Sequence, residues 1–395
     1  MTQKRRWRAT VPRLSQFAVE HLLLLPFGAL IALVWVQVDP ERYFRFSYAI
    51  SFPVNDVAMV FFFAVMTKEV VEATAPGGVL HPWRRALLPV TAAIGATVIP
   101  ALIHVRVVEA LDEPMLAASW PVTFATDLAI SYFIARLIFR PQHPAIPFLL
   151  LLAIASAALG FLALALFSPP GELHLAAGGL LLVVAMGLAW GLRRARVKSF
   201  WPYLIAAGGL SWWALYWSGL HPALALVPIM PFLPHAARDP GFFVDANPNA
   251  KDTLSRFEIW WRYPAQVALF FFGLVNAGVP VHALEAGTWG VPIAVIVGKP
   301  LGVLIAAGVA VAVGLHLPPR ISWRELIVVG FIAAIGFSVG LFFCAALLPP
   351  GQLRSEMSMG VLLSLLAAPV ALASAKALRV GRFASSPAPT SVDGS

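Results

Sequence analysis

Uninterrupted apolar segments recur along the whole chain, and they constrain its fold more than any other feature. One of them, residues 149–166, contains no ionisable side chain. A segment of that length is long enough to cross a bilayer as a helix. Inside a bilayer every backbone polar group must be hydrogen-bonded within the protein, so only helices or closed barrels can span it. With 59% hydrophobic and 12% charged residues, the sequence predicts an all-α polytopic membrane protein.

The apolar segments predict about twelve transmembrane helices that form one transmembrane unit over residues 17–379. This unit has two halves, joined by a polar loop at residues 236–258. A basic tail precedes it at residues 1–16, and a disordered tail follows it at residues 380–395. The expected spans are residues 17–38, 54–73, 87–104, 118–138, 146–167, 173–192, 200–217, 220–235, 260–279, 289–312, 326–348 and 357–378.

The basic residues predict how these spans are oriented. The chain carries a net charge of +9, which in a soluble protein would suggest nucleic-acid binding. Here most lysines and arginines fall in the two tails and in alternate loops, the asymmetry expected of cytoplasmic loops. We therefore expect both termini in the cytoplasm of a bacterium, no nucleic-acid partner, and insertion in the inner membrane without a cleavable signal peptide. The single cysteine, Cys344, excludes a disulfide framework or a zinc cluster.

Asp127 is the candidate site residue that the sequence singles out most clearly. It lies deep in the predicted span 118–138, just after Pro121, Thr123 and Thr126. A charge at bilayer depth costs about 2.5–3.5 kcal/mol on insertion scales, so an intramembrane carboxylate is a functional-site hypothesis. The alternative is a carboxylate that only satisfies the free N–H groups of a helix end.

Two predicted spans, one in each half of the chain, are interrupted by residues that weaken helices. The first is the span with Pro121, and the second is residues 326–348, with Gly336, Phe337, Ser338 and Gly340 near its centre. Paired interruptions point to a transporter site at the middle of the membrane, where half-helices expose backbone groups. The alternative is ordinary packing of small residues between helices.

Three further ionisable residues are candidates. Lys299 is the only cation at the depth of span 289–312, and it needs a carboxylate or backbone carbonyls as partners, or must lose its proton. We expect it to take part in transport or to be a structural counter-charge. Glu69 and Glu72 lie three residues apart on one helical face near the inner surface. They predict a cytoplasmic funnel for cations, or simply a solvated helix end.

Several short motifs, in this order and spacing, resemble those of the NhaA-type sodium/proton antiporters, over residues 17–378. The motifs are Asn55-Asp56 with Glu69, Ala125-Thr126-Asp127, Ser218-Gly219-Leu220-His221, Asn276-Ala277-Gly278, Gly298-Lys299-Pro300-Leu301-Gly302 and Ile335-Gly336-Phe337-Ser338. The resemblance implies a bacterial inner-membrane transporter with inverted repeats and two crossed, broken helices. It further implies that Thr126 and Asp127 form one break, and that Glu69 is a pH-response residue.

The chain departs from this family in the span 146–167. Family members carry an Asp-Asp-Leu-Gly run there, whose aspartates bind the ion and carry protons. Here the matching run is Ala157-Ala158-Leu159-Gly160, and Ser156 is the only side-chain oxygen of the span. A dehydrated cation prefers several hard oxygen ligands. Asp127, Thr126, Ser156 and backbone carbonyls would therefore have to form a rebuilt site.

Three functions remain open at this stage, none of them enzymatic. The first is exchange of a monovalent cation for protons, with altered or weakened coupling, centred on Asp127. The second is transport of an anion or organic acid centred on Lys299, and the third is a membrane protein that does not transport. We expect no cofactor, and as partners the lipid bilayer, small ions and a second copy of the chain. The alternating stretch Tyr43-Phe44-Arg45-Phe46-Ser47-Tyr48 suggests either a dimerising strand or a membrane-interface segment.

Overall fold

The computed structural model describes residues 24–74, 86–140, 143–167, 175–235 and 252–384. All regular structure within these ranges is helical, which confirms the all-α prediction. The tail 1–16 and most of the loop 236–258 lie outside the described residues. Of the C-terminal tail, residues 380–384 are described and include a short 3-10 helix, η10 (Gly381–Phe383).

The first half of the chain contains eight α-helices and several π- or 3-10 segments within the described residues. In order they are α2 (Leu24–Val38), α3 (Pro40–Phe52), η1 (Pro53–Ala58), α4 (Met59–Thr74), α5 (Leu87–Ala110), η3 (Pro114–Phe124), α6 (Leu128–Ile138), α7 (Ala145–Phe167), α8 (Leu175–Arg194), η4 (Tyr203–Gly208) and α9 (Gly209–Ser218).

The second half follows the loop 236–258 and is also helical where the structure describes it. Two 3-10 segments come before the loop, η5 (Pro222–Leu224) and η6 (Met230–Phe232). The predicted loop ends too late, because α10 (Thr253–Asn276) begins inside it, with Asp252 as the N-cap. The further elements are η7 (Val281–Ala283), η8 (Ala286–Trp289), α11 (Gly290–Ala312), α12 (Trp323–Ala333), α13 (Phe337–Leu347), α14 (Gln352–Leu363), η9 (Ser364–Leu366) and α15 (Ala367–Ala377).

Among the described residues, six helical segments are long and apolar enough to cross a membrane, or seven if the bent pair α12 and α13 counts as one span. This agrees with a multi-pass membrane protein, and the count of twelve stays a prediction. The predicted span 220–235 is wrong as a continuous helix. That segment contains only the short η5 and η6, because four prolines within it interrupt the helical hydrogen bonds.

The segment after residue 38 is a helix rather than a strand. Asp39 is the N-cap of α3 and accepts a hydrogen bond from the Arg42 N–H at 3.1 Å, with Pro40 at the first helical position. These are standard helix-start signals. They outweigh the alternating aromatic pattern that suggested a dimerising strand. The π-helix η1 then joins α3 to α4, so that residues 40–68 form one long apolar segment.

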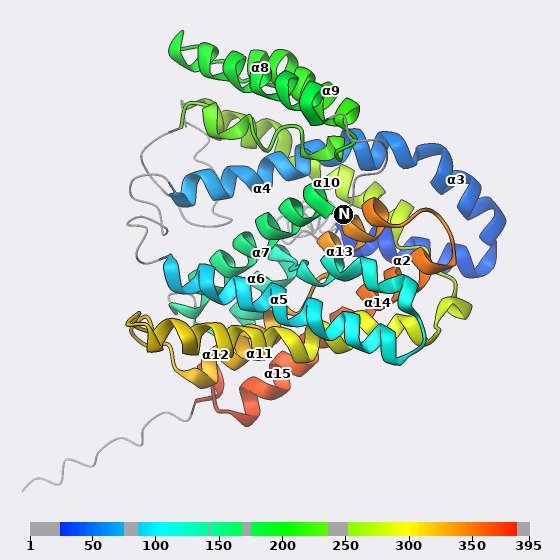
Figure 1. Ribbon diagram of the computed structural model, residues 1–395, viewed down its shortest axis with the longest axis vertical. Coiled ribbons are helices and arrows are strands. Elements are labelled where there is room, and N and C mark those ends of the chain that lie inside the picture. The colour runs from blue at the N-terminus through cyan, green and yellow to red at the C-terminus, as the bar shows by residue number, and fades with distance from the viewer. Residues whose placement is uncertain (1–23, 75–85, 141–142, 168–174, 236–251, 385–395) are drawn as a thin grey trace, which may run out of the picture.

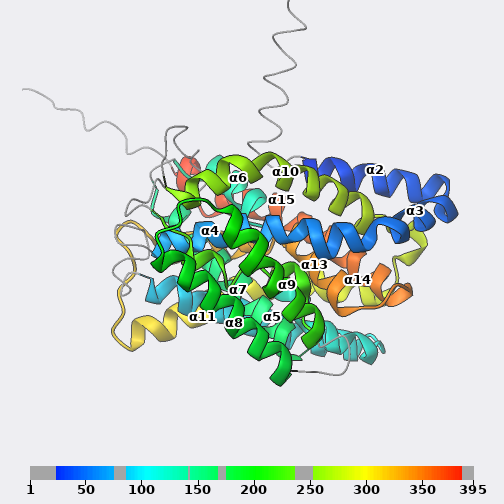
Figure 2. The same cartoon turned by 90° about the horizontal axis from the view of Figure 1, so that it is seen from above.

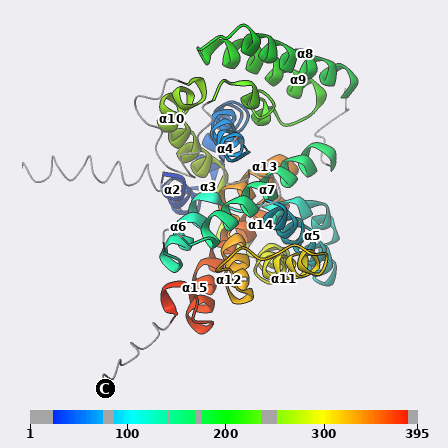
Figure 3. The same cartoon turned by 90° about the vertical axis from the view of Figure 1, so that its left-hand side faces the viewer.

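Many of the long helices run in roughly the same direction, and α5 and α11 lie side by side along their length (Figure 1). Helices α2 and α10 lie together along one edge (Figure 2). Helices α8 and α9 lie on one side of the molecule, and α12 and α15 lie on the opposite side (Figure 3). The two breaks, between η3 and α6 and between α12 and α13, lie in the interior between α7 and α11.

Helices α5 and α11 pack closely because a glycine of each faces the other helix. A Cβ atom at Gly302 would lie 2.0 Å from the Gly95 carbonyl oxygen, and one at Gly95 would lie 2.1 Å from that of Gly302. Such close approach of backbones is how small residues drive helix association in membranes. It fixes the position of α11, and therefore that of Lys299, which is three residues before Gly302.

The first prediction tests this contact. Gly302→Ala should lower the free energy of unfolding by about 2 kcal/mol, because the added methyl group has no room. Gly308→Ala is the matched control on the same helix, since nothing lies within 4 Å of its Cβ position; it should be neutral or stabilising by up to about 1 kcal/mol. Thermal unfolding of the detergent-purified variants measures both. Equal unfolding temperatures for the two variants would contradict the proposed packing role.

Candidate functional site

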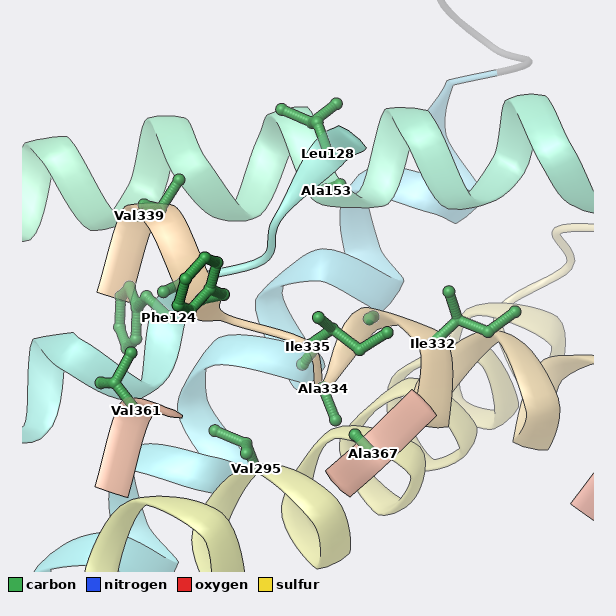
Figure 4. Packing of buried hydrophobic residues seen from close by; sticks show 14 of the residues in the cluster. Phe124, Leu128, Ala153, Val295, Ile332, Ala334, Ile335, Val339, Val361 and Ala367 are labelled. Atoms are coloured by element: carbon green, nitrogen blue, oxygen red, sulfur yellow. The ribbon is translucent and has the colours of Figure 1, made fainter. Parts of the chain in front are cut away.

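Two interrupted helices cross in the interior of the protein. The first is interrupted at residues 125–127, between η3 and α6. The second is interrupted at residues 334–336, between α12 and α13, whose axes are bent by 48°. The Asp127 N–H donates to the Ile335 carbonyl at 2.7 Å, and the Thr126 hydroxyl donates to the Ala333 carbonyl at 3.0 Å. Figure 4 shows the crossing from close by, with Ala153 of α7 on one side and Val295 of α11 on the other. The sequence prediction of two broken helices is therefore seen in the structure.

Lys299 bonds with the carbonyl ends of two half-helices. Its side chain is fully buried. The ammonium group donates to the Ala125 carbonyl oxygen, to the Thr126 Oγ1 atom at 2.8 Å and to the Ala333 carbonyl oxygen at 3.0 Å. The Phe124 carbonyl oxygen lies 3.5 Å away. Since η3 ends at Phe124 and α12 ends at Ala333, one cation compensates the negative ends of both.

Asp127 accepts hydrogen bonds from the N-terminal ends of the two half-helices that begin at the crossing, α6 and α13. It is 2% exposed. Its Oδ1 atom accepts from the Ile130 N–H of α6 at 2.9 Å. Its Oδ2 atom accepts from the Ser338 N–H at 3.0 Å and from the Ser338 hydroxyl at 2.5 Å. A carboxylate at a helix N-terminus is stabilised by the free N–H groups and by the helix dipole.

Lys299 and Asp127 form no ion pair with each other, although both are fully described. Each is bonded to the helix ends of the opposite sign. The sequence suggests either a carboxylate or backbone carbonyls as the partners of Lys299, and the geometry shows that they include the half-helix carbonyls. Asp127 caps two half-helices, and the space beside its carboxylate shows whether it could also hold an ion.

A small cavity lies beside Asp127. It has a volume of about 20 Å³ and is lined by Asp127, Ser338 and apolar side chains of α2, α4 and α10, among them Pro26, Phe62 and Leu269. A cavity of at least about 10–15 Å³ with polar partners is large enough for one water molecule. The cavity therefore has room for one small, largely dehydrated ion or one water against the carboxylate.

The helix α7 brings Ser156 and Ala157 into the interior. Ser156 is fully buried, and its hydroxyl has no hydrogen-bond partner among the residues that the structure describes. Ala157 is 8% exposed, whereas Ala158 is exposed. A Cβ atom at Gly160 would lie 2.6 Å from the Phe343 ring and 3.3 Å from the Phe124 Cβ. Because Ala157 and Gly160 share a helical face, this face meets α13 and the end of η3.

Phenylalanine side chains pack together one helical turn after Ala157, where Phe161 of α7 contacts α4 and α13. The Phe63 ring of α4 lies 4.7 Å from that of Phe161 on α7 and 4.6 Å from that of Phe342 on α13, both edge to face. The Phe161 ring also lies 5.7 Å from that of Phe343. Such edge-to-face pairs are favourable in a dry interior. The hydrogen bonds and ion pairs of the described residues place no second carboxylate at the crossing.

Glu72 lies in a buried ion-pair group instead of on the wall of a solvated funnel. Its carboxylate is 2.8 Å from the Lys68 ammonium, which is also 2.7 Å from Glu258 of α10. All three are at most 9% exposed. Lys68 lies in the predicted span 54–73 and Glu258 in the predicted loop 236–258, and no sequence motif links the two residues. Glu69 lies in α4, but its side chain is outside the described part of the chain.

The predicted residues Gly336, Phe337 and Ser338 lie at the second break, and two further serines form hydrogen bonds with its backbone. Gly336 is the N-cap of α13, and its N–H donates to the hydroxyl of Ser364 at 3.2 Å. Phe337 and Ser338 follow in the first turn, and only Ser338 contacts Asp127. Sequence reasoning missed Ser364 and also Ser131, whose hydroxyl donates to the Ile332 carbonyl at 3.1 Å. The sequence marks these two residues only as single serines within apolar spans, which is a weak indication of a functional role.

Discontinuous helices that cross at the centre of a polytopic helical protein, with charged side chains at their ends, define a class of secondary transporters. The chain is similar in sequence to members of one family of this class over nearly its whole length. The Na+/H+ antiporter 1 family model matches residues 23–375. The chain therefore belongs to the Na+/H+ antiporter 1 family.

The relatives give the extent of this similarity. The chain is 39% identical over 388 residues to a Na(+)/H(+) antiporter NhaA of Desulfitobacterium hafniense, with 96% of this chain and 97% of the relative covered. It is 37% identical over 385 residues to the Na(+)/H(+) antiporter NhaA of Geobacter metallireducens, with 95% and 100% covered. The sodium proton antiporter MjNhaP1 of Methanocaldococcus jannaschii has a similar fold, with a TM-score of 0.59 at 15% identity and 92% of both chains covered.

The second prediction tests the role of Lys299. Lys299→Met should lower the free energy of unfolding by about 3 kcal/mol, because it leaves the carbonyls of Ala125 and Ala333 buried without the cation. Lys376→Met, the same change at an exposed lysine of α15, should change it by less than about 0.5 kcal/mol. Thermal unfolding in detergent measures the difference. A Lys299→Met protein as stable as the Lys376→Met control would contradict this assignment.

Proposed function

We propose that this protein exchanges one monovalent cation, sodium or lithium, for one proton across the bacterial inner membrane, with Asp127 as the shared binding group. The observation that carries the proposal is the ion-sized cavity beside the buried carboxylate. A carboxylate there holds either a cation or a proton, and competition between the two is sufficient for exchange. The similarity to named Na(+)/H(+) antiporters supports the same reaction type.

The number of charges moved follows from the groups at the crossing. Asp127 is the one carboxylate that the described contacts place there, and Ala157 and Ala158 supply none. Every bond of the Lys299 ammonium is to an oxygen acceptor, so we treat it as a fixed charge. The negative charge of Asp127 is then cancelled by the bound cation or by the bound proton, so the net charge of the site is the same in both states. We therefore propose electroneutral exchange, an altered coupling compared with relatives that retain two aspartates.

Candidate ligands for the cation are oxygen atoms of residues already described. They are the carboxylate of Asp127 and the hydroxyl of Ser338, which line the cavity. Ser156 on α7, the third oxygen that the sequence suggests, does not line this cavity. A hard monovalent cation prefers oxygen ligands of this kind. Thr126 is a weaker candidate, because its hydroxyl already donates to Ala333 and accepts from Lys299.

Transport of an anion on Lys299 is less well supported. An anion would have to replace the carbonyl oxygens that the ammonium group now contacts, and the side chain is completely buried. A membrane protein that does not transport is less well supported, because the relatives that cover nearly the whole chain are named Na(+)/H(+) antiporters. The orientation proposed from the basic loops, with both termini in the cytoplasm, and a homodimer both stay predictions.

The third prediction tests Asp127 directly. Addition of sodium or lithium to proteoliposomes with a preset pH gradient should collapse the gradient for the unmodified protein and not for Asp127→Asn. Asp252→Asn is the matched control, because Asp252 is also an N-cap, of α10, and accepts from the Ser255 N–H at 3.0 Å. Asparagine caps helices about as well as aspartate, so both variants should fold. Unchanged exchange by Asp127→Asn would exclude it as the shared binding group.

The fourth prediction tests the charge count. Exchange by the unmodified protein should not depend on membrane potential, because one positive charge moves each way. The double variant Ala157→Asp, Ala158→Asp should make the rate depend on the potential, since it restores the acids that the resembling family uses at these positions. The rate is measured with the potential clamped at different values by potassium and valinomycin. A potential-dependent rate for the unmodified protein would contradict the single-carboxylate account.

A further inference from the structure

A second, larger cavity opens at the end of the molecule where α3 and the start of α14 lie. Its volume is about 660 Å³, the size of a small-molecule site. Its apolar wall includes Tyr43, Tyr48, Val279 and Pro280. In the orientation predicted from the basic loops, this end faces the outside of the cell. The cavity is separate from the one beside Asp127, and their linings share no residue.

Arg354 brings a positive charge to the lining of this cavity. Its Nη2 atom donates to the Asn276 Oδ1 atom at 2.8 Å, and the Asn276 amide group in turn donates to the Oδ1 atom of Asn55 at 2.8 Å. This is the only bond that the described part of the protein offers the guanidinium. The remaining N–H groups, on Nε and Nη1, have no acceptor among the described residues.

The other charged group of the lining does not neutralise Arg354. Glu285 is in the lining, but its Oε1 atom accepts from the Gln352 side-chain amide at 3.0 Å, and its carboxylate also forms the capping box of η8. Glu285 and Arg354 form no ion pair, and both belong to the described residues. His282 also lines the cavity and brings no negative charge.

A half-buried guanidinium with one neutral acceptor is an unfavourable arrangement. Arginine presents its N–H groups as a planar fork that fits a carboxylate or phosphate through two parallel hydrogen bonds. The first turn of α14 begins beside it, and the N-cap residue Gly351 has no side chain to occupy the free N–H groups. The apolar wall then suits the remainder of such a ligand.

We propose that this cavity binds an organic oxyanion, a carboxylate or phosphate group on an apolar body, through Arg354. The ligand joins α3, the segment after α10 and the start of α14, because all three contribute to the lining. It therefore stabilises the folded protein by mass action. The same chemistry is found in a soluble aromatic or aliphatic acid and in the phosphate headgroup of an anionic lipid.

The experiment measures the thermal unfolding temperature of the full chain in an uncharged detergent at constant ionic strength, with chloride as the reference anion. The probes are benzoate, inorganic phosphate and short-chain phosphatidylglycerol, with a diacylglycerol of the same chain length as its phosphate-free control. We expect a saturable rise with at least one probe. A rise with benzoate or phosphate identifies a soluble ligand, and a rise with phosphatidylglycerol alone identifies a lipid.

The variants decide whether Arg354 is responsible. Arg354→Gln keeps a side chain that can donate to Asn276 and should bind at least tenfold more weakly. Arg354→Lys keeps the charge without the fork and should bind more weakly but still saturably. The control is Arg106→Gln, an exposed arginine of α5 outside the cavity, which should bind as the unmodified protein does. Equal binding by Arg354→Gln, or no rise with any probe, would overturn the proposal.

Discussion

Four helix ends meet in the interior of this protein, and the rest of the structure depends on how their charges are compensated. Two ends present carbonyl oxygens and two present N–H groups, all buried in the protein interior away from bulk water. Lys299 donates to the first pair and Asp127 accepts from the second. The crossing is stable because each charge is bonded to helix ends of the opposite sign.

The same arrangement limits the chemistry of the site. Lys299 is held between α5 and α12 because α11 packs closely on both: a Cβ atom at Gly298 would lie 2.7 Å from Pro100, and one at Gly330 would lie 2.5 Å from Pro300. Because every contact of its ammonium group is with an oxygen acceptor, our proposal assigns Lys299 the same charge in both states of the exchange. Asp127, in contrast, borders a cavity of about 20 Å³. The change of charge during exchange is therefore assigned to one carboxylate, and Ala157 explains why no second acid shares it.

Much of this crossing could be predicted from the sequence. Pro121 and Gly336 mark the two breaks, and Asp127 stands out because an intramembrane carboxylate is rare. The partners of Lys299 could not be deduced, since they are mainly backbone carbonyls, which every residue has. The helix α3 was missed, although Asp39 and Pro40 signal its start, because the alternating aromatic residues that follow also fit a strand. The pairing of Lys68 with Glu258 joins residues 190 positions apart, which no local pattern reveals.

The central claim is that one carboxylate exchanges one proton for one cation. The most direct measurement is proton release when sodium or lithium binds to the purified protein in weakly buffered detergent solution, followed with a pH indicator and compared with the amount of cation bound. The account predicts one proton released for each cation bound, and none for Asp127→Asn. Release of two protons per cation, or cation binding that releases none, would contradict it.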